Sequence, residues 1–217
     1  MNTPQEHKIS VLLVDDHPPI RSGIRAMLER TPDLCIVGEA ENGDEARRLL
    51  EELRPQIILL DLVIPGFSPA AFEKWARQNY PETSTLVLTG HDRDHLLASM
   101  MKAGVAGYLD KSIQPEGLVD AIRRAACGEY LFTERQAARV QSWRTDVEER
   151  WNSLSDREKK ILRLLATGAA HKSISSKLQI KPKTLDKHLG RIYRKLGVAS
   201  GTEAALWAKE HGEESTY

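Results

Sequence analysis

Short apolar runs that each stop abruptly at polar residues constrain the fold of this chain most strongly. The clearest are ISVLLV, IILL and TLVL, and two weaker ones read LCIV and VAGYL. Continuous apolar runs of this length are typical of parallel strands that are covered on both faces. The five expected strands are 9–14, 34–37, 57–60, 85–88 and 105–109.

Helical patterns fill the intervals between these strands. A strand followed by a helix, repeated five times within about 127 residues, predicts an α/β domain with a doubly wound, five-stranded parallel sheet. The expected helices of this domain are 18–30, 43–53, 69–79, 93–103 and 115–127.

The polar residues at the strand ends predict a shared site. The carboxyl ends of parallel strands meet at one edge of a sheet, so we expect Asp15, Asp16, Asp61, Thr89 and Lys111 to converge there. Three carboxylates repel one another unless a hard cation such as Mg²⁺ lies between them. A lysine and a hydroxyl beside them suit a phosphoryl group, which a carboxylate can accept. Any one Asp after a strand is usually a turn residue, but five such residues at matching strand ends indicate a site.

The second part of the chain is basic and has only helical patterns. Residues 1–152 hold 18 basic and 24 acidic side chains, whereas residues 153–217 hold 13 basic and 7 acidic ones. We therefore expect a first domain over 1–128, a partly helical linker over 129–152 and a small all-α domain over 153–217. Within the linker, Trp143 and Trp151 are interpreted as isolated anchors. The later helices are expected at 155–167, 171–178, 182–196 and 201–211.

The pattern of the second domain favours a helix-turn-helix that binds DNA. Ser155 and Glu158 form a capping box, and Pro182 begins a helix with an apolar stripe on one side. A basic helix set against a short scaffold helix can enter the major groove. The alternative is a small bundle with a charged outer face. The residues expected to face DNA are Lys183, Thr184, Lys187, Gly190, Arg191 and Arg194.

The motifs VLLVDDH, IILLDLVIPG, LVLTG and GYLDKS resemble the receiver domain of two-component response regulators, in the same order and over about 120 residues. The resemblance implies a flavodoxin-like fold with Asp61 as the phospho-acceptor. It also implies Asp16 as a direct Mg²⁺ ligand, Asp15 acting mainly through water, and the backbone carbonyl of Val63 as a further ligand.

The same resemblance assigns roles in switching. Lys111 is expected to pair with the phosphoryl group, the Thr89 hydroxyl to move toward it, and Tyr108 to turn inward on activation. Gly90 leaves the small space that a phosphoryl group needs.

The segment from LSDREKKILRLLATG to GTEAALWA resembles a LuxR-type DNA-binding domain along its whole length. This resemblance adds His188, which is also at a motif position, to the expected DNA contacts. Together the halves resemble the NarL/FixJ class of response regulators. This implies a cytoplasmic transcription regulator, phosphorylated by a sensor histidine kinase and bound to promoter DNA as a homodimer. Asp186 departs from the family, which commonly has Lys there. An acid that faces the duplex lowers affinity unless it accepts from a cytosine amino group or points away. Two consequences remain open: a shifted sequence preference, or an affinity low enough that a dimer is required.

Other functions have weaker support. A phosphatase with an Asp nucleophile needs a second Asp where this chain has Val63, and no P-loop or dinucleotide-binding motif is present, so we expect no enzyme. His91 and His95 have helical metal-ligand spacing but lack a third ligand. A signalling module that acts through protein contacts remains the alternative. The two cysteines show no CxxC spacing, and no apolar run is long enough to span a membrane.

Overall fold

The computed structural model describes residues 8–90 and 92–211. The chain divides into two compact units, Met1–Val140 and Gln141–Tyr217, so the division falls within a helix rather than in a loop. Each unit has its own hydrophobic core.

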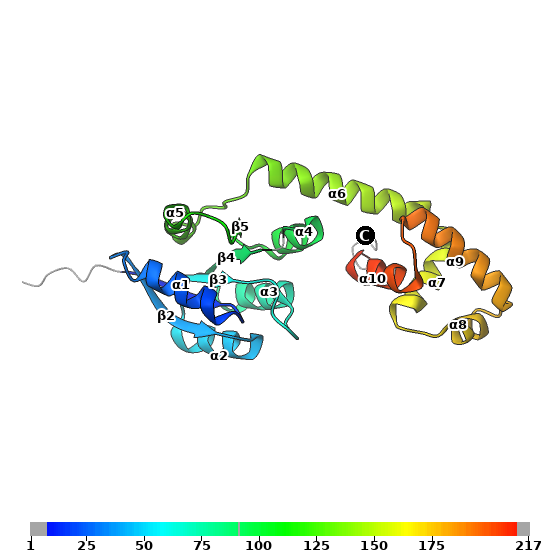
Figure 1. Ribbon diagram of the computed structural model, residues 1–217, viewed down its shortest axis with the longest axis horizontal. Coiled ribbons are helices and arrows are strands. Elements are labelled where there is room, and N and C mark those ends of the chain that lie inside the picture. Colours follow the sequence, from blue (N-terminus) through cyan, green and yellow to red (C-terminus); the bar gives the residue numbers. More distant parts are fainter. Residues whose placement is uncertain (1–7, 91, 212–217) are drawn as a thin grey trace, which may run out of the picture. The chain divides into compact units, whose positions relative to one another are not determined.

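The first unit contains a five-stranded parallel sheet with the strand order β2-β1-β3-β4-β5 (Figure 1). The predicted doubly wound α/β fold is therefore confirmed. The second strand runs three residues further than its apolar run, because hydrogen bonding to β1 continues through Gly38, Glu39 and Ala40. The strands are β1 (Ile9–Val14), β2 (Leu34–Ala40), β3 (Ile57–Leu60), β4 (Ser84–Thr89) and β5 (Gly107–Asp110).

Five helices cover the two faces of this sheet. Side chains of α1 and α5 share one core with alternate residues of β1, β3 and β4, whereas α2, α3 and α4 lie over the opposite face (Figure 1). Three of the helices start with proline in the first turn, where no backbone N–H is needed. Their bounds are α1 (Pro18–Leu28), α2 (Gly43–Leu53), α3 (Pro69–Asn79), α4 (Asp94–Ala103) and α5 (Pro115–Ala126).

The expected linker segment is largely helical. Its helix, α6, is continuous for 20 residues, and its last turns belong to the core of the second unit. The interpretation of Trp151 as an isolated anchor is wrong, because its side chain is 3% exposed and stacks on Trp207 at a centroid distance of 6.3 Å. Trp143 packs against the same core. The second unit comprises the end of α6 (Glu134–Ser153) together with α7 (Asp156–Ala166), α8 (His171–Lys177), α9 (Pro182–Leu196) and α10 (Gly201–His211).

The boundaries of α7 and α9 follow from local chemistry. The predicted capping box is present, because the Ser155 hydroxyl accepts from the Glu158 backbone N–H while the Glu158 carboxylate accepts from the Ser155 N–H. Gly197 ends α9 in the left-handed conformation, at φ +69°, which costs glycine little. No helix in the described ranges is both long and apolar enough to cross a bilayer.

Candidate functional site

An acidic cluster lies at the carboxyl ends of β1 and β3. The backbone N–H of Asp61 donates to the Val14 carbonyl at 2.8 Å, which holds Asp61 beside the end of β1. Asp15 and Asp61 are 2% and 3% exposed, and the Asp16 side chain is about one quarter exposed. Ligand atoms of these three carboxylates and of His17 all lie within 4.8 Å of one another. The convergence expected from the strand ends is therefore present.

Lys111, from the end of β5, reaches into the same cluster. Its Nζ lies 2.7 Å from Asp15 Oδ2 and 2.9 Å from Asp61 Oδ2. Burial alone would lower the pKa of Lys111, but its hydrogen bonds and charge interactions with the two carboxylates outweigh burial and raise this pKa. The ammonium group therefore stays charged at neutral pH and compensates one of the three acids.

The donor set fits a hard divalent cation. Asp15 Oδ1 accepts from the His17 backbone N–H and Asp61 Oδ1 from the Leu62 N–H, each at 2.8 Å. Asp16 Oδ1, by contrast, is buried without a hydrogen bond of acceptable geometry from the described residues, although His17 Nδ1 lies 2.7 Å away. A buried carboxylate oxygen that accepts no well-aligned hydrogen bond, beside two further carboxylates, is what an oxygen-ligated ion such as Mg²⁺ would satisfy.

His17 and Val63 are neighbours of the acidic cluster. His17 was not selected from the sequence, although its position directly after Asp15-Asp16 was a usable signal. Val63 lies in the loop two residues after Asp61, with its side chain 43% exposed. His91 lies outside the described residues, so the structure does not test its hypothetical metal pairing with His95.

Thr89 and Gly90 lie at the end of β4, beside Lys111. Thr89 is fully buried, and its carbonyl accepts from the Lys111 backbone N–H at 3.0 Å. A Cβ built on Gly90 would meet no atom within 4 Å, so open space adjoins this residue. The β4 end therefore offers a hydroxyl-bearing side chain and free volume next to the Lys111 segment.

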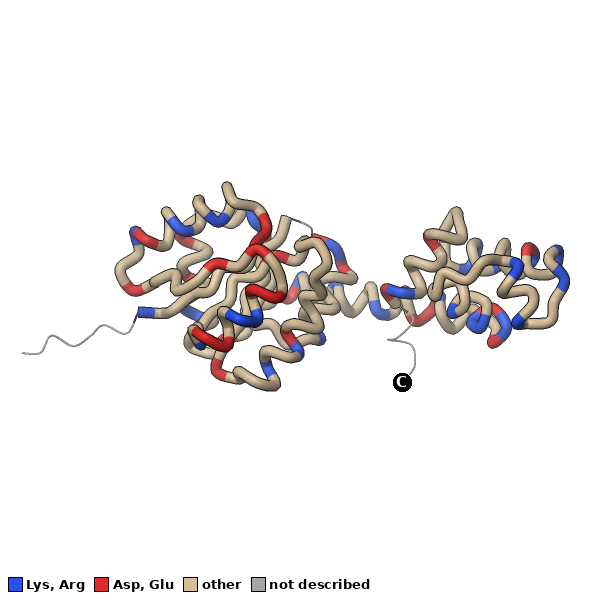
Figure 2. Tube along the Cα trace, turned by 90° about the horizontal axis from the view of Figure 1, so that it is seen from below, with Lys and Arg blue, Asp and Glu red and all other residues tan. Residues whose placement is uncertain are grey.

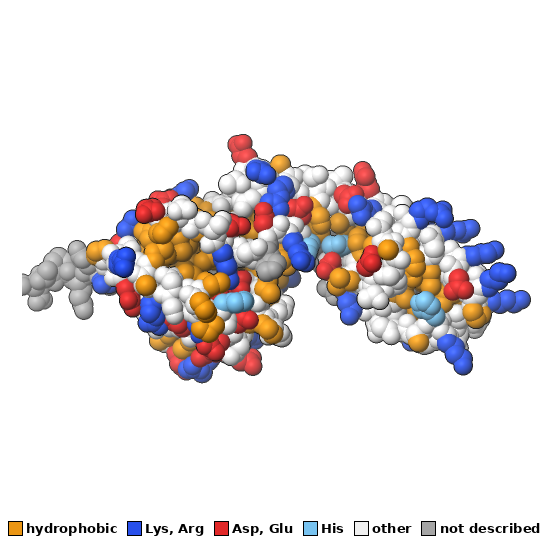
Figure 3. All heavy atoms as spheres, viewed as in Figure 1, with side chains coloured by type: hydrophobic (Ala, Val, Ile, Leu, Met, Phe, Trp, Pro, Cys, Tyr) orange, Lys and Arg blue, Asp and Glu red, His pale blue; other side chains and the backbone are white. Residues whose placement is uncertain are grey.

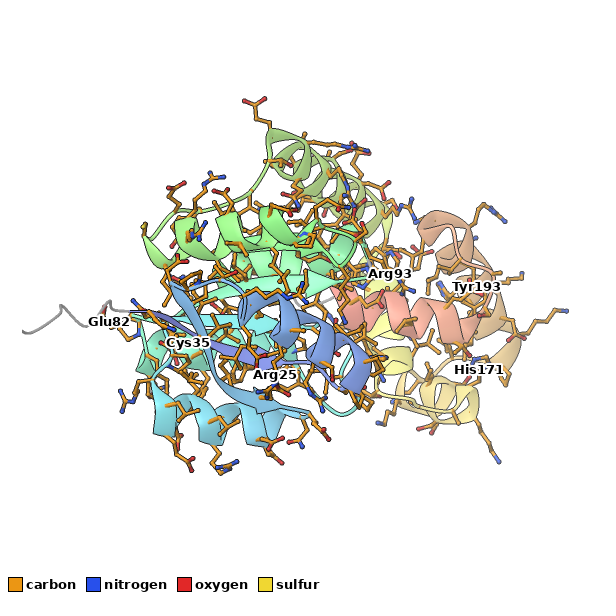
Figure 4. The ribbon with its side chains drawn as sticks, turned by 60° about the vertical axis from the view of Figure 1, so that its left-hand side comes forward. Arg25, Cys35, Glu82, Arg93, His171 and Tyr193 are labelled. Carbon is orange, nitrogen blue, oxygen red and sulfur yellow. The ribbon has the colours of Figure 1, made fainter. Side chains whose placement is uncertain are left out.

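Tyr108 lies on β5 and is already buried, at 4% exposure. Burial, reinforced by the charge of Asp92, raises the pKa of its hydroxyl, which is hydrogen-bonded to the backbone of Arg93 in the segment between β4 and α4. Figure 4 shows Arg93 in this segment. The Tyr108 carbonyl accepts from Gln136 Nε2 of α6 at 2.8 Å. Tyr108 therefore contacts both the segment after Thr89 and the start of α6.

A second contact joins α6 to this segment. Arg139 donates through Nε and Nη2 to Asp94 Oδ1, at 2.9 and 2.6 Å, and through Nη1 to Asp92 Oδ2 at 2.7 Å. Hydrogen bonds to both carboxylates raise the pKa of Arg139. We call Arg139, Asp92 and Asp94 the Arg139 cluster. Sequence reasoning missed it, because the partners are 45 and 47 positions apart on the surface of the first unit.

In the second unit, α9 presents a basic face. Leu185, Leu189 and Ile192 face the core, and the opposite side of the helix is solvent-exposed. Lys and Arg side chains project from this side in a row (Figure 3). Along the trace of the second unit, basic residues alternate with a few acidic ones (Figure 2). The exposed residues on α9 include six of the seven predicted contacts, namely Lys183, Thr184, Lys187, Gly190, Arg191 and Arg194.

His188 is placed differently from these six residues. It is half-buried at the margin of the exposed side, and its Nδ1 is buried without a hydrogen bond from the described residues. Only a limited part of its ring is therefore open to a ligand on the exposed face.

The scaffold that orients α9 is held by a buried ion pair. Glu158 of α7 is 3% exposed, and its Oε2 accepts from Lys195 Nζ at 2.7 Å. Burial would raise the pKa of Glu158, but the hydrogen bonds from Lys195 and Ser155 outweigh burial and lower this pKa. Arg157 of α7 also donates to the Leu178 carbonyl at the end of α8. Polar contacts therefore join α7 to both helices of the predicted helix-turn-helix.

Comparison with known families assigns each of the two units to a family. The sequence model of the response regulator receiver domain matches residues 11–123, and that of the luxR family of bacterial regulatory proteins matches residues 152–208. The chain is similar to the nitrate/nitrite response regulator NarL of Escherichia coli, with 34% identity over 93% of this chain and 95% of NarL. It is also similar to the transcriptional regulatory protein LiaR of Bacillus subtilis, with 37% identity over 92% of this chain and 96% of LiaR.

A solved structure of a response regulator is also similar to this chain. RcsB from Salmonella enterica serovar Typhimurium, bound to the promoter rprA with the phosphomimetic BeF₃⁻, matches with a TM-score of 0.60 and 26% identity. The match covers 93% of this chain and 99% of that one. The chain therefore belongs to the NarL-type response regulators, which join a receiver domain to a LuxR-family helix-turn-helix domain.

Proposed function

We propose that this protein is a transcription regulator whose binding to promoter DNA is controlled by phosphorylation of Asp61. The observation that carries the proposal is the meeting of Lys111 with Asp15 and Asp61 at one edge of the sheet, at 2.7 and 2.9 Å. A buried carboxylate beside a fixed ammonium group and an acidic ion site is suited to accept a phosphoryl group.

In the proposed transfer, a carboxylate oxygen of Asp61 attacks the phosphorus atom of a phosphohistidine on a sensor kinase. The new O–P bond makes an acyl phosphate, and the broken P–N bond returns its electron pair to the histidine ring. Lys111 neutralises a phosphoryl oxygen. Asp16, Asp61 and the Val63 carbonyl would hold Mg²⁺, with Asp15 acting through water. Bound there, the ion would neutralise charge on the transferred group.

The switch would start at Thr89, whose hydroxyl would turn to bond the phosphoryl group. Asp92 lies only three residues further along the chain and belongs to the Arg139 cluster. Tyr108 is bonded to the same segment and to α6. These contacts support a role for Thr89 and Tyr108 in transmitting the phosphorylation state to the linker helix.

The second unit would supply DNA contact through α9. Lys183, Lys187, Arg191 and Arg194 would bind phosphates or base edges, with Thr184, Gly190 and the exposed edge of His188 alongside them. We assign residues 1–128 to the receiver, 129–152 to the linker and 153–217 to DNA binding. The active form would be a cytoplasmic homodimer, because doubling a weak contact is a direct route to useful affinity.

Phosphorylation is tested by incubating the full chain with the phosphoryl donor acetyl phosphate. Asp61→Asn should abolish acyl-phosphate formation, detected by mass spectrometry, whereas Asp44→Asn on the exposed surface of α2 should not. A phosphoryl group still found on the Asp61→Asn variant would refute the assignment of Asp61 as the phospho-acceptor. Turnover of more than one phosphoryl group per chain on an external ester would instead favour the phosphatase alternative.

DNA binding is tested by gel shift at two salt concentrations. Lys187→Ala and Arg191→Ala should each weaken binding without lowering the melting temperature, and the affinity of the wild type should fall steeply with salt. The control Arg144→Ala removes one exposed charge from α6. Unchanged affinity of both α9 variants at low salt would mean that this helix does not face DNA, and would favour the protein-contact alternative.

A further inference from the structure

The exposed side of α9 carries one acid among its basic residues. Asp186 lies three residues after Lys183 and four before Gly190, and these spacings make all three neighbours on one side of the helix. Asp186 is exposed and is the only acidic residue of α9. Its position within the predicted DNA-facing surface therefore requires an explanation.

The usual structural roles of a helical aspartate do not account for Asp186. The N-cap of α9 is Lys181, and the first turn contains no acidic residue, so Asp186 neither caps the helix nor stabilises its first turn. Within residues 8–90 and 92–211, no hydrogen bond or ion pair involves its carboxylate, although Lys183 and Lys187 are near in sequence. Its charge therefore remains available to a ligand.

The surroundings of Asp186 leave room for a base-pair edge. One turn further along α9 is Gly190, where a built Cβ would meet nothing within 4 Å, so no side chain covers that flank. Tyr193 follows on the same side, but its hydroxyl lies at the start of α10. A Cβ on Gly201 would be 2.9 Å from this hydroxyl and 3.8 Å from His171 Nε2 of α8 (Figure 4). The Tyr193 hydroxyl is thus directed toward α8 and α10, although burial and the nearby charge of Asp186 both raise its pKa.

The chemistry of the major groove restricts what an exposed carboxylate can bind. Phosphates repel it, and guanine and thymine present only acceptors on this edge apart from the thymine methyl group. Adenine offers its N6 amino group, but the neighbouring N7 acceptor opposes a second acceptor. Cytosine offers its N4 amino group without an adjacent acceptor on the same base, so it is the best partner for a carboxylate.

We propose that Asp186 determines sequence specificity by accepting a hydrogen bond from the N4 amino group of a cytosine in each half-site. This inference rests on the proposed function, because it requires α9 to enter the major groove. The acid lowers affinity for DNA that lacks the cytosine and thereby separates correct from incorrect sites. Asp186 therefore increases the difference in affinity between correct and incorrect sites, and it does not increase the affinity for DNA as a whole.

The test selects bound fragments from random DNA with the full chain in the presence of beryllofluoride. Wild type should enrich one cytosine in each half-site, and replacing that C·G pair by T·A should weaken binding by about 5- to 150-fold. Asp186→Asn should move the preference at this pair toward adenine, whose N6 and N7 match an amide. Asp186→Ala should reduce discrimination there to less than about 3-fold and raise affinity for random DNA.

Glu149→Gln on α6 is the matched control, because it changes the net charge as Asp186→Asn does but lies outside α9. This control should leave the selected sequence unchanged. If wild type enriches a site and both Asp186→Asn and Asp186→Ala enrich the same site at every position, the inference is overturned. The proposed DNA binding would still stand in that case. No enrichment by wild type would overturn the proposed function itself, and the inference with it.

Discussion

Replacing Asp16 by Asn should stabilise the receiver when metal is absent and destabilise it relative to wild type when Mg²⁺ is present. The ligand atoms of Asp15, Asp16 and Asp61 lie within 4.8 Å of one another, and Lys111 bonds to Asp15 and Asp61 but, of the carboxylates that the structure describes, not to Asp16. At that separation, two unit charges repel by about 3.5 kcal/mol at an effective dielectric constant of 20 and by about 0.9 kcal/mol at 80. Because Asp16 is partly exposed, we expect a gain of about 1–2 kcal/mol.

With Mg²⁺ present, wild type should be more stable than Asp16→Asn. An ion bound only to the folded state stabilises it by about 2.7 kcal/mol when its concentration is 100 times the dissociation constant. Wild type should gain this amount, whereas Asp16→Asn, which lacks one carboxylate of the site, should gain much less. The curves of stability against Mg²⁺ concentration for the two proteins should therefore cross.

Native-state hydrogen exchange is the suitable assay, because peptides from β1 and β3 report on the receiver alone. Their buried amides exchange through unfolding, so the exchange rate gives the free energy of unfolding. The measurement compares EDTA with MgCl₂, and Asp44→Asn serves as a control for charge on the exposed surface of the same unit. Lower stability of Asp16→Asn in EDTA, or an equal gain from Mg²⁺ in both proteins, would refute the reasoning.

Three further predictions concern other charged groups. Burial raises the pKa of Glu73, which is 1% exposed in α3, above 4.5, so its ionisation opposes folding. Glu73→Gln should therefore stabilise the receiver at pH 7, and hydrogen exchange should show this gain vanish below about pH 4.5. The pKa of Glu158 is lowered instead, so its ionisation favours folding and its removal should destabilise the protein. Glu158→Gln should cost the second unit about 1–2 kcal/mol at pH 7, because Lys195 loses its ion pair but keeps its hydrogen bond to the Ser153 carbonyl, and tryptophan-detected melts should show the loss fade on acidification below about pH 4.5. Arg139→Ala should speed amide exchange in the first two turns of α6 without a phosphodonor, whereas Arg135→Ala, an exposed neighbour without such ion pairs, should not.

The sheet and the acidic cluster could be predicted because a parallel sheet has a direction. Every strand of such a sheet has its carboxyl end at the same edge, so Asp15, Asp61 and Lys111 had to converge although 96 positions separate the first from the last. The strands are also buried on both faces, which makes their sequences continuously apolar and easy to locate. Direction and burial together placed the site without any knowledge of side-chain contacts.

The contacts of α6 could not be predicted in this way. Its sequence is strongly polar, and a helix with one or two apolar residues per turn does not reveal which neighbour they meet. Trp151 looked isolated because its partner, Trp207, is on the last helix of the chain. Arg139 pairs with Asp92 and Asp94 through surface geometry alone, for which spacing in the sequence carries no signal.

The strength of the Arg139 cluster suits a reversible switch. Exposed ion pairs contribute about 0–1 kcal/mol each, and the carboxylates of Asp92 and Asp94 are 46% and 42% exposed, so the cluster holds α6 by about 1–2 kcal/mol. Under the proposed function, roughly one resting molecule in ten would then have this contact open. A phosphoryl group that gains one to three charge-assisted hydrogen bonds can offset the free energy of the cluster, so the contact would open in most of the remaining molecules. A much stronger, buried ion pair at the same position would hold α6 against phosphorylation, so the exposure of the cluster is a requirement of switching.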